Sequence, residues 1–381
     1  MKIMTVLGTR PEIIRLSVVI RQLDEYAQHI LVHTGQNYDD RLSEIFFRNM
    51  RIRTPDVYVG VRGTSFGEQI GQILARSEEL FLAHRPDRLL ILGDTNSGLS
   101  AIVARRLGIP VYHMEAGNRC YDDRVPEEVN RRTIDHASSV LMPYTERARE
   151  NLLREGIPGD RIYVTGNPIK QVIDAYADDI AASTALADHG LSEQEYLVVT
   201  MHRAENVDVP ERLTALLEAL SLLHERYRYP VICSFHPRTR SKAEAQGADT
   251  SREGVRFVEP LGFFDFVKLE QSAFCLLSDS GTVQEEGCIF GVPNVTIRDV
   301  TERPETIDCG SNVLSGVDPE RILELVGMVT SRRGQWQPPA EYLVGNVSDT
   351  VCRILLSYRV PDAAEAQWQR APSGRDINAS R

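Results

Sequence analysis

Four side chains that can accept or donate protons lie in loops after predicted strands. They are Asp94, Glu115, Glu127 and His202. An isolated carboxylate after a strand most often caps the next helix, and an isolated histidine is usually structural. The carboxyl ends of neighbouring parallel strands meet at one edge of a sheet, so four such groups together favour general acid–base catalysis. We therefore take these four as candidate acids or bases.

Two strand-to-helix junctions carry the features of a phosphate site. At residues 8–12, a glycine lets a ligand approach the backbone, the helix amino end favours anions, and Arg10 can bind a phosphate through several donors. At residues 278–286, Ser280 and Gly281 would hold a diphosphate, and Glu286 could accept hydrogen bonds from ribose hydroxyls. A tight turn and simple helix capping are the alternative explanations.

Two further motifs admit two interpretations each. The aromatic run at residues 263–266 could provide Phe266 for stacking on a base, or it could belong to the core. Residues 63–67 fit the Gly-x-Ser-x-Gly pattern of a hydrolase nucleophile. We favour Ser65 as a helix cap, because Glu68 three residues later completes a capping box.

Short apolar runs alternate with amphipathic stretches of helix length, which predicts an α/β fold with largely parallel sheets. The predicted strands are 3–7, 30–33, 57–59, 89–92, 111–114, 140–142, 162–164, 196–200, 231–234, 255–258, 275–277 and 294–297. The predicted helices are 12–26, 39–49, 66–84, 97–107, 127–137, 145–155, 210–227, 262–271, 281–290, 318–331 and 347–358. The pattern therefore predicts two Rossmann-like doubly wound domains facing a cleft.

The domain boundaries follow from the break between the two series of elements. We expect an N-terminal domain over 1–170, joined by a C-terminal helix at 347–360, and a second domain over 171–346. The polar segment 361–381 is expected to be disordered.

Composition excludes several classes of protein. The chain of 381 residues has 43 basic and 54 acidic side chains and a formal charge of −11, which argues against nucleic-acid binding. No apolar run is long enough for membrane insertion, so a cytoplasmic location is expected. The six cysteines are scattered, so neither a metal site nor a disulfide framework is indicated. Because Gly-x-Gly and Gly-Lys motifs are absent, we expect no nicotinamide cofactor and no P-loop.

Taken together, the motifs resemble the non-hydrolysing UDP-N-acetylglucosamine 2-epimerase family, which has a glycosyltransferase-B-like fold. The resemblance runs over residues 2–358 and rests on segments in the family's order: 8–12, 93–95, 115–117, 126–128, 202–203, 279–281, 284–286 and 301–305. It implies catalytic roles for Asp94, Glu115, Glu127 and His202. The positions that it implies for binding the substrate or its UDP group are Arg10, Arg15, Arg131, His236, Phe266, Ser280, Gly281, Glu286 and Arg303.

The chemistry implied by this resemblance is inversion at C2 of a UDP-sugar without a cofactor. Loss of UDP from C1 with removal of the C2 proton gives a 2-acetamido-glycal, and re-addition after protonation on the other face completes the inversion. The product would be a precursor of cell-surface polysaccharides. Members of the family are commonly dimers, so a homodimer is also expected.

Some positions depart from the family's pattern, so the sequence leaves two candidate substrates. Arg15 stands where many members carry Lys, residues 34–37 differ from the regulatory segment, and residues 118–121 replace a Leu-Arg-Ser/Thr run. These features are similar to a branch that acts on UDP-2-acetamido-2,6-dideoxy-L-talose and makes UDP-N-acetyl-L-fucosamine, although residues 201–206 fit that branch less well. The alternatives from other classes are a glycosyltransferase of the same fold, a hydrolysing relative and a non-catalytic UDP-sugar binder.

Overall fold

The structure is a computed structural model that describes residues 1–35, 46–63, 65–235, 237–247 and 250–358. Some sequence predictions lie outside these residues: His236, Gln36, Asn37, Thr64, most of the helix expected over 39–49, and the tail 361–381. The described chain divides into two compact units. One comprises Met1–Pro168 with the segment from Val344 onward, and the other comprises Ile169–Leu343.

The first unit is built on a parallel sheet that has six strands in the described residues, in the order β3-β2-β1-β4-β5-β6. These strands are β1 (Lys2–Leu7), β2 (Gln28–His33), β3 (Val57–Tyr58), β4 (Arg88–Leu92), β5 (Val111–Met114) and β6 (Val140–Met142). Apart from the edge strand β3 and the first residues of β1 and β2, their side chains are buried, as expected for a sheet covered on both faces.

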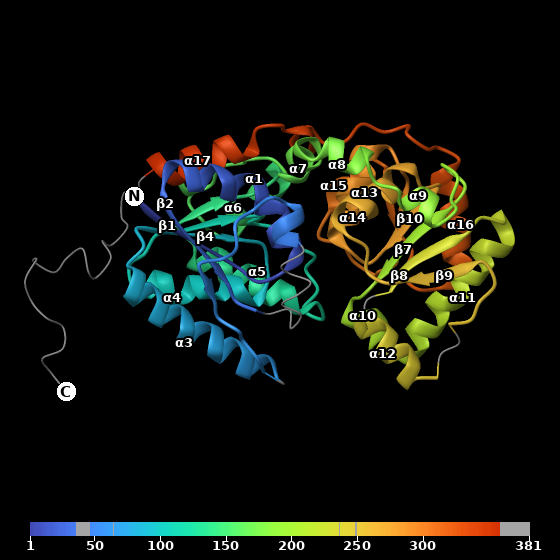
Figure 1. Ribbon diagram of the computed structural model, residues 1–381, viewed down its shortest axis with the longest axis horizontal. Helices are drawn as coiled ribbons and strands as arrows, with labels where there is room; N and C mark the ends of the chain where they lie inside the picture. The colour runs from blue at the N-terminus through green and yellow to red at the C-terminus, as the bar shows by residue number, and fades with distance from the viewer. Residues whose placement is uncertain (36–45, 64, 236, 248–249, 359–381) are drawn as a thin grey trace, which may run out of the picture. The chain divides into compact units, whose positions relative to one another are not determined.

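Helices cover both faces of this sheet (Figure 1). They are α1 (Arg10–Tyr26), α3 (Phe66–His84), η1 (Asn96–Leu99), α4 (Ser100–Arg106), α5 (Pro126–Ala137), α6 (Glu146–Arg154), η2 (Gly159–Arg161) and α17 (Val347–Ser357). Helix α17 packs beside α1, and Gln22 of α1 donates a hydrogen bond to Asp349 of α17. The opposite face packs on α3 and α4 through Phe81, Ala101 and Ala104.

The second unit repeats the same topology. Within the described residues its parallel sheet has six strands in the order β12-β11-β10-β7-β8-β9. They are β7 (Leu197–Met201), β8 (Val231–Phe235), β9 (Val255–Val258), β10 (Cys275–Ser278), β11 (Asn294–Thr296) and β12 (Asn312–Leu314). Numbered within each unit, both sheets have the Rossmann order 3-2-1-4-5-6. The prediction of an α/β fold with two Rossmann-like units is therefore confirmed.

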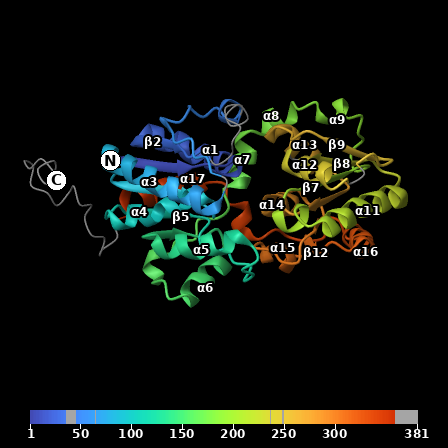
Figure 2. The same ribbon diagram turned by 90° about the horizontal axis from the view of Figure 1, so that it is seen from below.

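Helices also cover both faces of the second sheet, as Figure 2 shows from another side. They are α7 (Ile169–Ala175), α8 (Ala177–Ala181), α9 (Ala185–Asp188), α10 (Ala204–Val207), α11 (Pro210–Tyr227), α12 (Pro237–Ala245), α13 (Phe263–Ser272), α14 (Gly281–Phe290), α15 (Pro304–Asp308), α16 (Pro319–Thr330) and η3 (Ala340–Leu343). No helix in the described part of the chain is long and apolar enough to cross a membrane.

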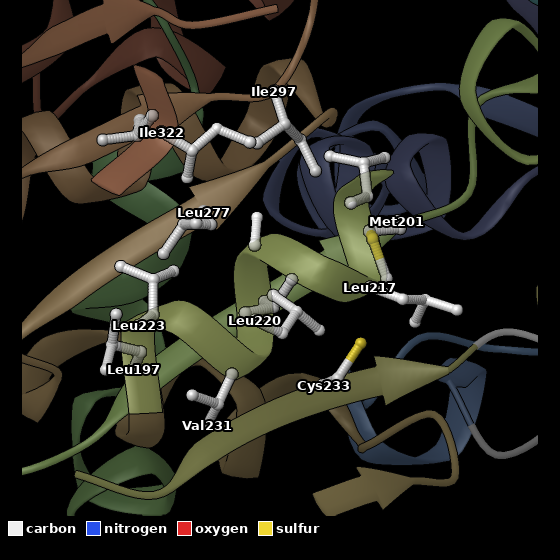
Figure 3. Packing of buried hydrophobic residues seen from close by; sticks show 14 of the residues in the cluster. Leu197, Met201, Leu217, Leu220, Leu223, Val231, Cys233, Leu277, Ile297 and Ile322 are labelled. Carbon is white, nitrogen blue, oxygen red and sulfur yellow. The ribbon is translucent and has the colours of Figure 1, made fainter. Parts of the chain in front are cut away.

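The core of the second unit shows why α11 forms where it does. Leu213, Leu216, Leu217, Leu220 and Leu223 recur at helical spacing and are buried. Figure 3 shows three of them against the side chains of β7, β8 and β10. Tight packing of this kind holds the carboxyl ends of these strands in place.

One predicted strand is absent from the described residues, and one strand was missed. Residues 162–164 form only one bridge, between Ile162 and Leu141, because β6 ends before Pro143, which has no amide to continue the pairing. Strand β12 was not predicted, because its three residues begin with the polar Asn312. In the structure Asn312 is buried, and its side-chain amide donates to Gln284 and Thr306.

Candidate active site

The order of the strands shows where a ligand would bind in each unit. Strands β1 and β4 are neighbours whose connections lead to opposite sides of the first sheet, and β7 and β10 have the same relation in the second. Ligands of doubly wound folds bind outside the carboxyl ends of strands at such a switch point. Gly8 directly follows β1, and Asp94 follows the glycine after β4. In the second unit, His202 lies in the loop after β7, and Ser280 lies in the loop after β10.

Glu12 organises the first of these loops. Its carboxyl group accepts hydrogen bonds from the backbone amides of Gly8 and Thr9 at 3.0 and 2.8 Å, and from the Thr9 and Thr95 hydroxyls at 2.8 and 3.0 Å. Burial raises the pKa of Glu12 to about 7, although these donors act to lower it. One side chain thus joins the loops that follow β1 and β4. Arg10 begins α1 beside them, with its guanidinium 5.5 Å from the centre of the Phe46 ring.

Glu115 follows β5 and is held by three donors from different elements. Nη1 of Arg15 lies 3.0 Å from Oε2, the Tyr144 hydroxyl donates to the same oxygen at 3.2 Å, and the Asn118 amide donates to Oε1 at 3.2 Å. Its φ of 64° lies in the left-handed region, where a non-glycine residue is strained and often functional. Donors around a carboxylate stabilise its charged form, which is the form that accepts a proton.

Asp94 is held by a second buried arginine. Nε and Nη2 of Arg131 both approach Oδ2 of Asp94, at 2.8 and 2.7 Å, and the Arg131 side chain is only 4% exposed. The Asn130 amide donates to the Asp94 carbonyl at 2.9 Å. Gly93, the residue before Asp94, lies close to Glu115, because a Cβ added to Gly93 would lie 3.7 Å from Oε2 of Glu115.

The two consecutive glutamates of α5 have different surroundings. Glu128 is buried, accepts hydrogen bonds from the amides of Cys120 and Tyr121, and pairs with Arg131 at 2.8 Å. Burial acts to raise the pKa of Glu128, but these donors lower it overall. Glu127 is half-buried in the first turn of α5. Glu128 therefore supports the loop, and Glu127 keeps its candidate role as an expectation.

A buried group of charges supports these loops from behind. Asp135 accepts from His113 at 2.9 Å, pairs with Arg119 at 2.8 Å, and accepts from the Gly117 amide at 3.1 Å. Nε2 of His113 reaches the Gly93 carbonyl at 2.8 Å. Burial acts to raise the pKa of Asp135, but His113 and Arg119 lower it overall. This group fixes the glycine before Asp94 and the segment after Glu115.

His202 of the second unit is positioned by Asp279. The buried Asp279 carboxylate accepts from the amides of His202 and Arg203 at 3.0 and 2.9 Å, and it lies 3.1 Å from Nδ1 of His202. Burial acts to raise the pKa of Asp279, but the charge of His202 and these donors lower it to about 2. The His202 side chain is 45% exposed. It can therefore meet a ligand while its backbone is held fixed.

The start of α14 is closely packed and polar. A Cβ added to Gly281 would lie 2.9 Å from Oε1 of Glu302, so this position needs glycine or a displacement of Glu302. Arg303 lies beside it and pairs with the buried Glu285. Ser280 is the N-cap residue of α14, and its hydroxyl meets that of Thr282 at 2.9 Å instead of capping the helix. A helix amino end favours anions, and the expectation of a diphosphate site here stays a prediction.

The remaining predicted binding residues have mixed outcomes. Phe266 is half-buried on α13 and packs against the core of that face, so both interpretations of it remain. His236 lies outside the described residues. Ser65 caps α3 by accepting a hydrogen bond from the Glu68 amide at 3.2 Å, as expected.

Sequence analysis missed the residues that hold the candidate groups. These residues are Tyr144, Asp135 and Asp279, and each is far along the sequence from the residue that it contacts. Only Asp279 gave a signal, because it belongs to a segment on which the resemblance rests. The others come together only through the fold.

Comparison with known proteins supports the resemblance. Residues 21–356 match the family described as UDP-N-acetylglucosamine 2-epimerase. A UDP-N-acetylglucosamine 2-epimerase of Methanocaldococcus jannaschii is 38% identical over 93% of this chain and 99% of its own length. The crystal structure of the M. jannaschii enzyme with UDP-GlcNAc and UDP has a TM-score of 0.89 at 38% identity, over 93% of this chain and 99% of that one.

A second relative is named for a different substrate. A UDP-2,3-diacetamido-2,3-dideoxy-D-glucuronate 2-epimerase of Pseudomonas aeruginosa is also 38% identical, over 85% of this chain and 91% of its own length. Both relatives invert C2 of a UDP-linked acetamido sugar, as their names state. With a family match over most of its length, the chain belongs to the UDP-N-acetylglucosamine 2-epimerase family.

Proposed function

We propose that this chain is a non-hydrolysing UDP-N-acetylhexosamine 2-epimerase that converts UDP-N-acetylglucosamine to UDP-N-acetylmannosamine. The observation that carries the proposal is the pair of carboxylates, Asp94 and Glu115, each beside a buried arginine at the carboxyl ends of the neighbouring strands β4 and β5. Family membership supplies the class of substrate. The product would supply precursors of cell-surface polysaccharides.

The reaction proceeds by elimination and re-addition. A base removes the C2 proton, the C1–O bond breaks with its electron pair leaving on UDP, and a double bond forms between C1 and C2. An acid then protonates C2 on the opposite face while an oxygen of UDP attacks C1. Elimination removes a proton from C2 and the UDP anion from C1, and re-addition returns both, so there is no net change of oxidation state and the inversion needs no hydride acceptor.

The residues divide between proton transfer and stabilisation of the leaving group. Asp94, Glu115 and Glu127 share the proton transfers, with Arg131 paired with Asp94 and Arg15 paired with Glu115. The amino end of α14, with Ser280 and Gly281, holds the diphosphate. Arg10, Arg303 and His236 add cationic or donor groups, Phe266 contacts the base, and Glu286 accepts from the ribose hydroxyls. His202 assists departure of the leaving group.

A second substrate is favoured by specific residues. Arg15 and the segment Asn118 to Tyr121 are similar to the branch that acts on UDP-2-acetamido-2,6-dideoxy-L-talose. In the structure Arg15 and Asn118 both contact the candidate catalytic Glu115. The departures from the common pattern therefore lie at the site of the chemistry, where they would affect the choice of sugar.

The decisive experiment follows solvent exchange at C2. The enzyme is incubated in heavy water with UDP-N-acetylglucosamine, and NMR is used to detect deuterium at C2, a manno-configured product and the transient glycal. Parallel samples contain the 6-deoxy-talose nucleotide and the 2,3-diacetamido-glucuronate nucleotide. We expect deuterium exchange at C2 with at least one of the three nucleotide sugars, and the one that exchanges fastest is the substrate.

Substitutions test whether hydrogen exchange at C2 depends on the candidate catalytic residues. Glu115→Gln and Asp94→Asn should lower the exchange rate by at least about 100-fold, as expected for loss of a general acid or base, whereas Glu253→Gln at an exposed position should not change it. Normal exchange in all of Asp94→Asn, Glu115→Gln and Glu127→Gln would refute the assignment. Transfer of the sugar to an acceptor without exchange would indicate a glycosyltransferase, and release of free sugar would indicate a hydrolysing enzyme.

We also propose that the enzyme is a cytoplasmic homodimer. All six cysteines are in the described residues and none forms a disulfide, as is common in reducing compartments. Helix α3 exposes two large apolar side chains near its opposite ends, Phe66 at 59% and Leu82 at 50%, and we propose that a second copy covers them. Sedimentation velocity should give twice the chain mass, and a double change of these residues to Ser should give the monomer. A monomer in the unmodified protein would refute the dimer.

A further inference from the structure

A pair of buried glutamates lies behind the proposed ribose site. Glu286 of α14 is 5% exposed, and Glu270 of the neighbouring helix α13 is fully buried. In the described residues, no N–H or O–H group donates a hydrogen bond to either oxygen of Glu270. The carboxyl group of Glu286 is its close polar neighbour. Within the part of the chain that the structure describes, Glu270 is thus a fully buried acidic side chain that takes part in no ion pair.

Two adjacent buried carboxyl groups cannot both be charged at low cost. Removing a charge from water is unfavourable, and a second negative charge beside the first adds repulsion. Burial, and then the charge of Glu286, raise the pKa of Glu270 well above its usual range. A proton shared between the two groups turns the repulsion into a hydrogen bond, with one net charge on the pair.

This single charge fits the proposed ligand. The nearby amino end of α14 is the proposed site for a diphosphate, and a doubly charged pair behind it would repel that group. Glu286, by contrast, needs a negative oxygen to accept hydrogen bonds from ribose hydroxyls. A neutral Glu270 beside a charged Glu286 satisfies both requirements.

We propose that Glu270 is a positioning residue of the nucleotide site, which as a protonated acid donates a hydrogen bond to Glu286 and orients the Glu286 carboxylate toward the ribose hydroxyls. This inference rests on the proposed function, because that proposal assigns the ribose to Glu286. Glu270 itself does not touch the nucleotide. Its effect should therefore appear as selectivity for the hydroxylated ribose.

The test compares binding of UDP, 2′-deoxy-UDP and 3′-deoxy-UDP by calorimetry with the full-length protein. In the unmodified protein, UDP should bind about tenfold more tightly than at least one deoxy analogue, since hydrogen bonds to charged groups contribute this much. Glu270→Gln keeps a donor and should preserve the preference within about twofold. Glu270→Met removes the donor and should reduce the preference to about twofold or less while weakening UDP itself.

The controls separate positioning from a general loss of structure. Glu253→Gln, an exposed acid of the same unit, should leave all three affinities unchanged. A purely structural role would weaken the three nucleotides equally, so an unchanged preference in Glu270→Met would overturn the inference. If Glu270→Met does not fold, a lost preference in Glu270→Gln would overturn it as well. The absence of any preference in the unmodified protein would also overturn it, and C2 exchange with a UDP-sugar would show that the proposed function survives.

Discussion

Asp94 and Glu115 each lie beside a buried arginine, yet the two pairs are built differently. Two nitrogens of Arg131 converge on one oxygen of Asp94, and Arg131 also pairs with the buried Glu128. Arg15 gives one nitrogen to Glu115 and shares that oxygen with the Tyr144 hydroxyl. Arg15 pairs with Glu115 at 3.0 Å, so its charge acts directly on that carboxylate.

This difference predicts how substitutions of Arg15 behave. Arg15→Lys keeps a cation beside Glu115, and we expect the C2 exchange rate to stay within about tenfold of normal. Arg15→Met leaves Glu115 in a largely buried place without its cation, and we expect exchange to fall by at least about 100-fold, equivalent to about 3 kcal/mol. The exchange rate in heavy water, followed by NMR, measures both.

Arg106 at the exposed end of α4 is a suitable control, and Arg106→Met should exchange normally. Full activity of Arg15→Met would show that the cation is not needed at Glu115.

Among the helices, the start of α1 links stability to pH. The Thr9 and Glu12 capping box fixes this start, and Glu12 also holds Thr95 in the loop after β4. The pKa of Glu12 is raised to about 7 from about 4.5, so the folded protein binds a proton that the unfolded chain releases. The free energy of unfolding therefore falls as pH rises through this range.

Glu12→Gln should remove this dependence. The amide oxygen can still accept from Gly8 and Thr9, and the amide nitrogen can donate to Thr95. Between pH 5 and 8 the variant should gain about 2 kcal/mol relative to the unmodified protein. Urea unfolding at several pH values measures the difference. Glu25→Gln, at the exposed end of the same helix, should give a pH-independent difference. Parallel curves for Glu12→Gln would contradict the prediction.

The buried Asp135 predicts a larger effect on stability. Asp135→Asn would leave His113 and Arg119 without their shared buried carboxylate, and we expect the free energy of unfolding at pH 7 to fall by about 3–5 kcal/mol. Because the pKa of Asp135 is lowered, its contribution is present above the unfolded pKa and is lost as pH falls. Asp123→Asn at an exposed position should cost less than about 0.5 kcal/mol. Equal losses in the two variants would contradict this role for Asp135.

Most long elements were predictable from the sequence because their apolar residues are periodic. Helices α3, α11 and α14 begin and end at the predicted residues. The short helices α7 to α10, α12 and α15 were not predicted, because four to nine residues show too little periodicity. The motifs placed the candidate residues at strand ends, but no local pattern shows that Tyr144 reaches Glu115 or that Glu270 lies beside Glu286.

At the scale of the whole molecule, the proposed function divides its tasks between two units of the same topology. Proton transfer is assigned chiefly to side chains at the switch point of the first sheet, and the uridine diphosphate to the helix that starts at the switch point of the second. Each unit prepares its groups with its own buried network, centred on Asp135 in the first and on Asp279 in the second. Binding and chemistry should therefore be separable by substitution.

Glu127→Gln changes a half-buried side chain of the first unit, and we expect the dissociation constant for UDP to stay within about twofold while C2 exchange falls by at least about 100-fold. Glu286→Gln changes the second unit, and we expect UDP to bind about tenfold more weakly because a charged acceptor is lost. Calorimetry with UDP and exchange NMR at saturating UDP-sugar measure the two quantities on the same samples. A saturating concentration of UDP-sugar compensates for weak binding. At saturation, the exchange rate of Glu286→Gln should therefore approach that of the unmodified protein, whereas the rate of Glu127→Gln should stay low. Loss of UDP binding in Glu127→Gln, or an equal and unrecoverable loss of exchange in both variants, would show that the two tasks are not divided in this way.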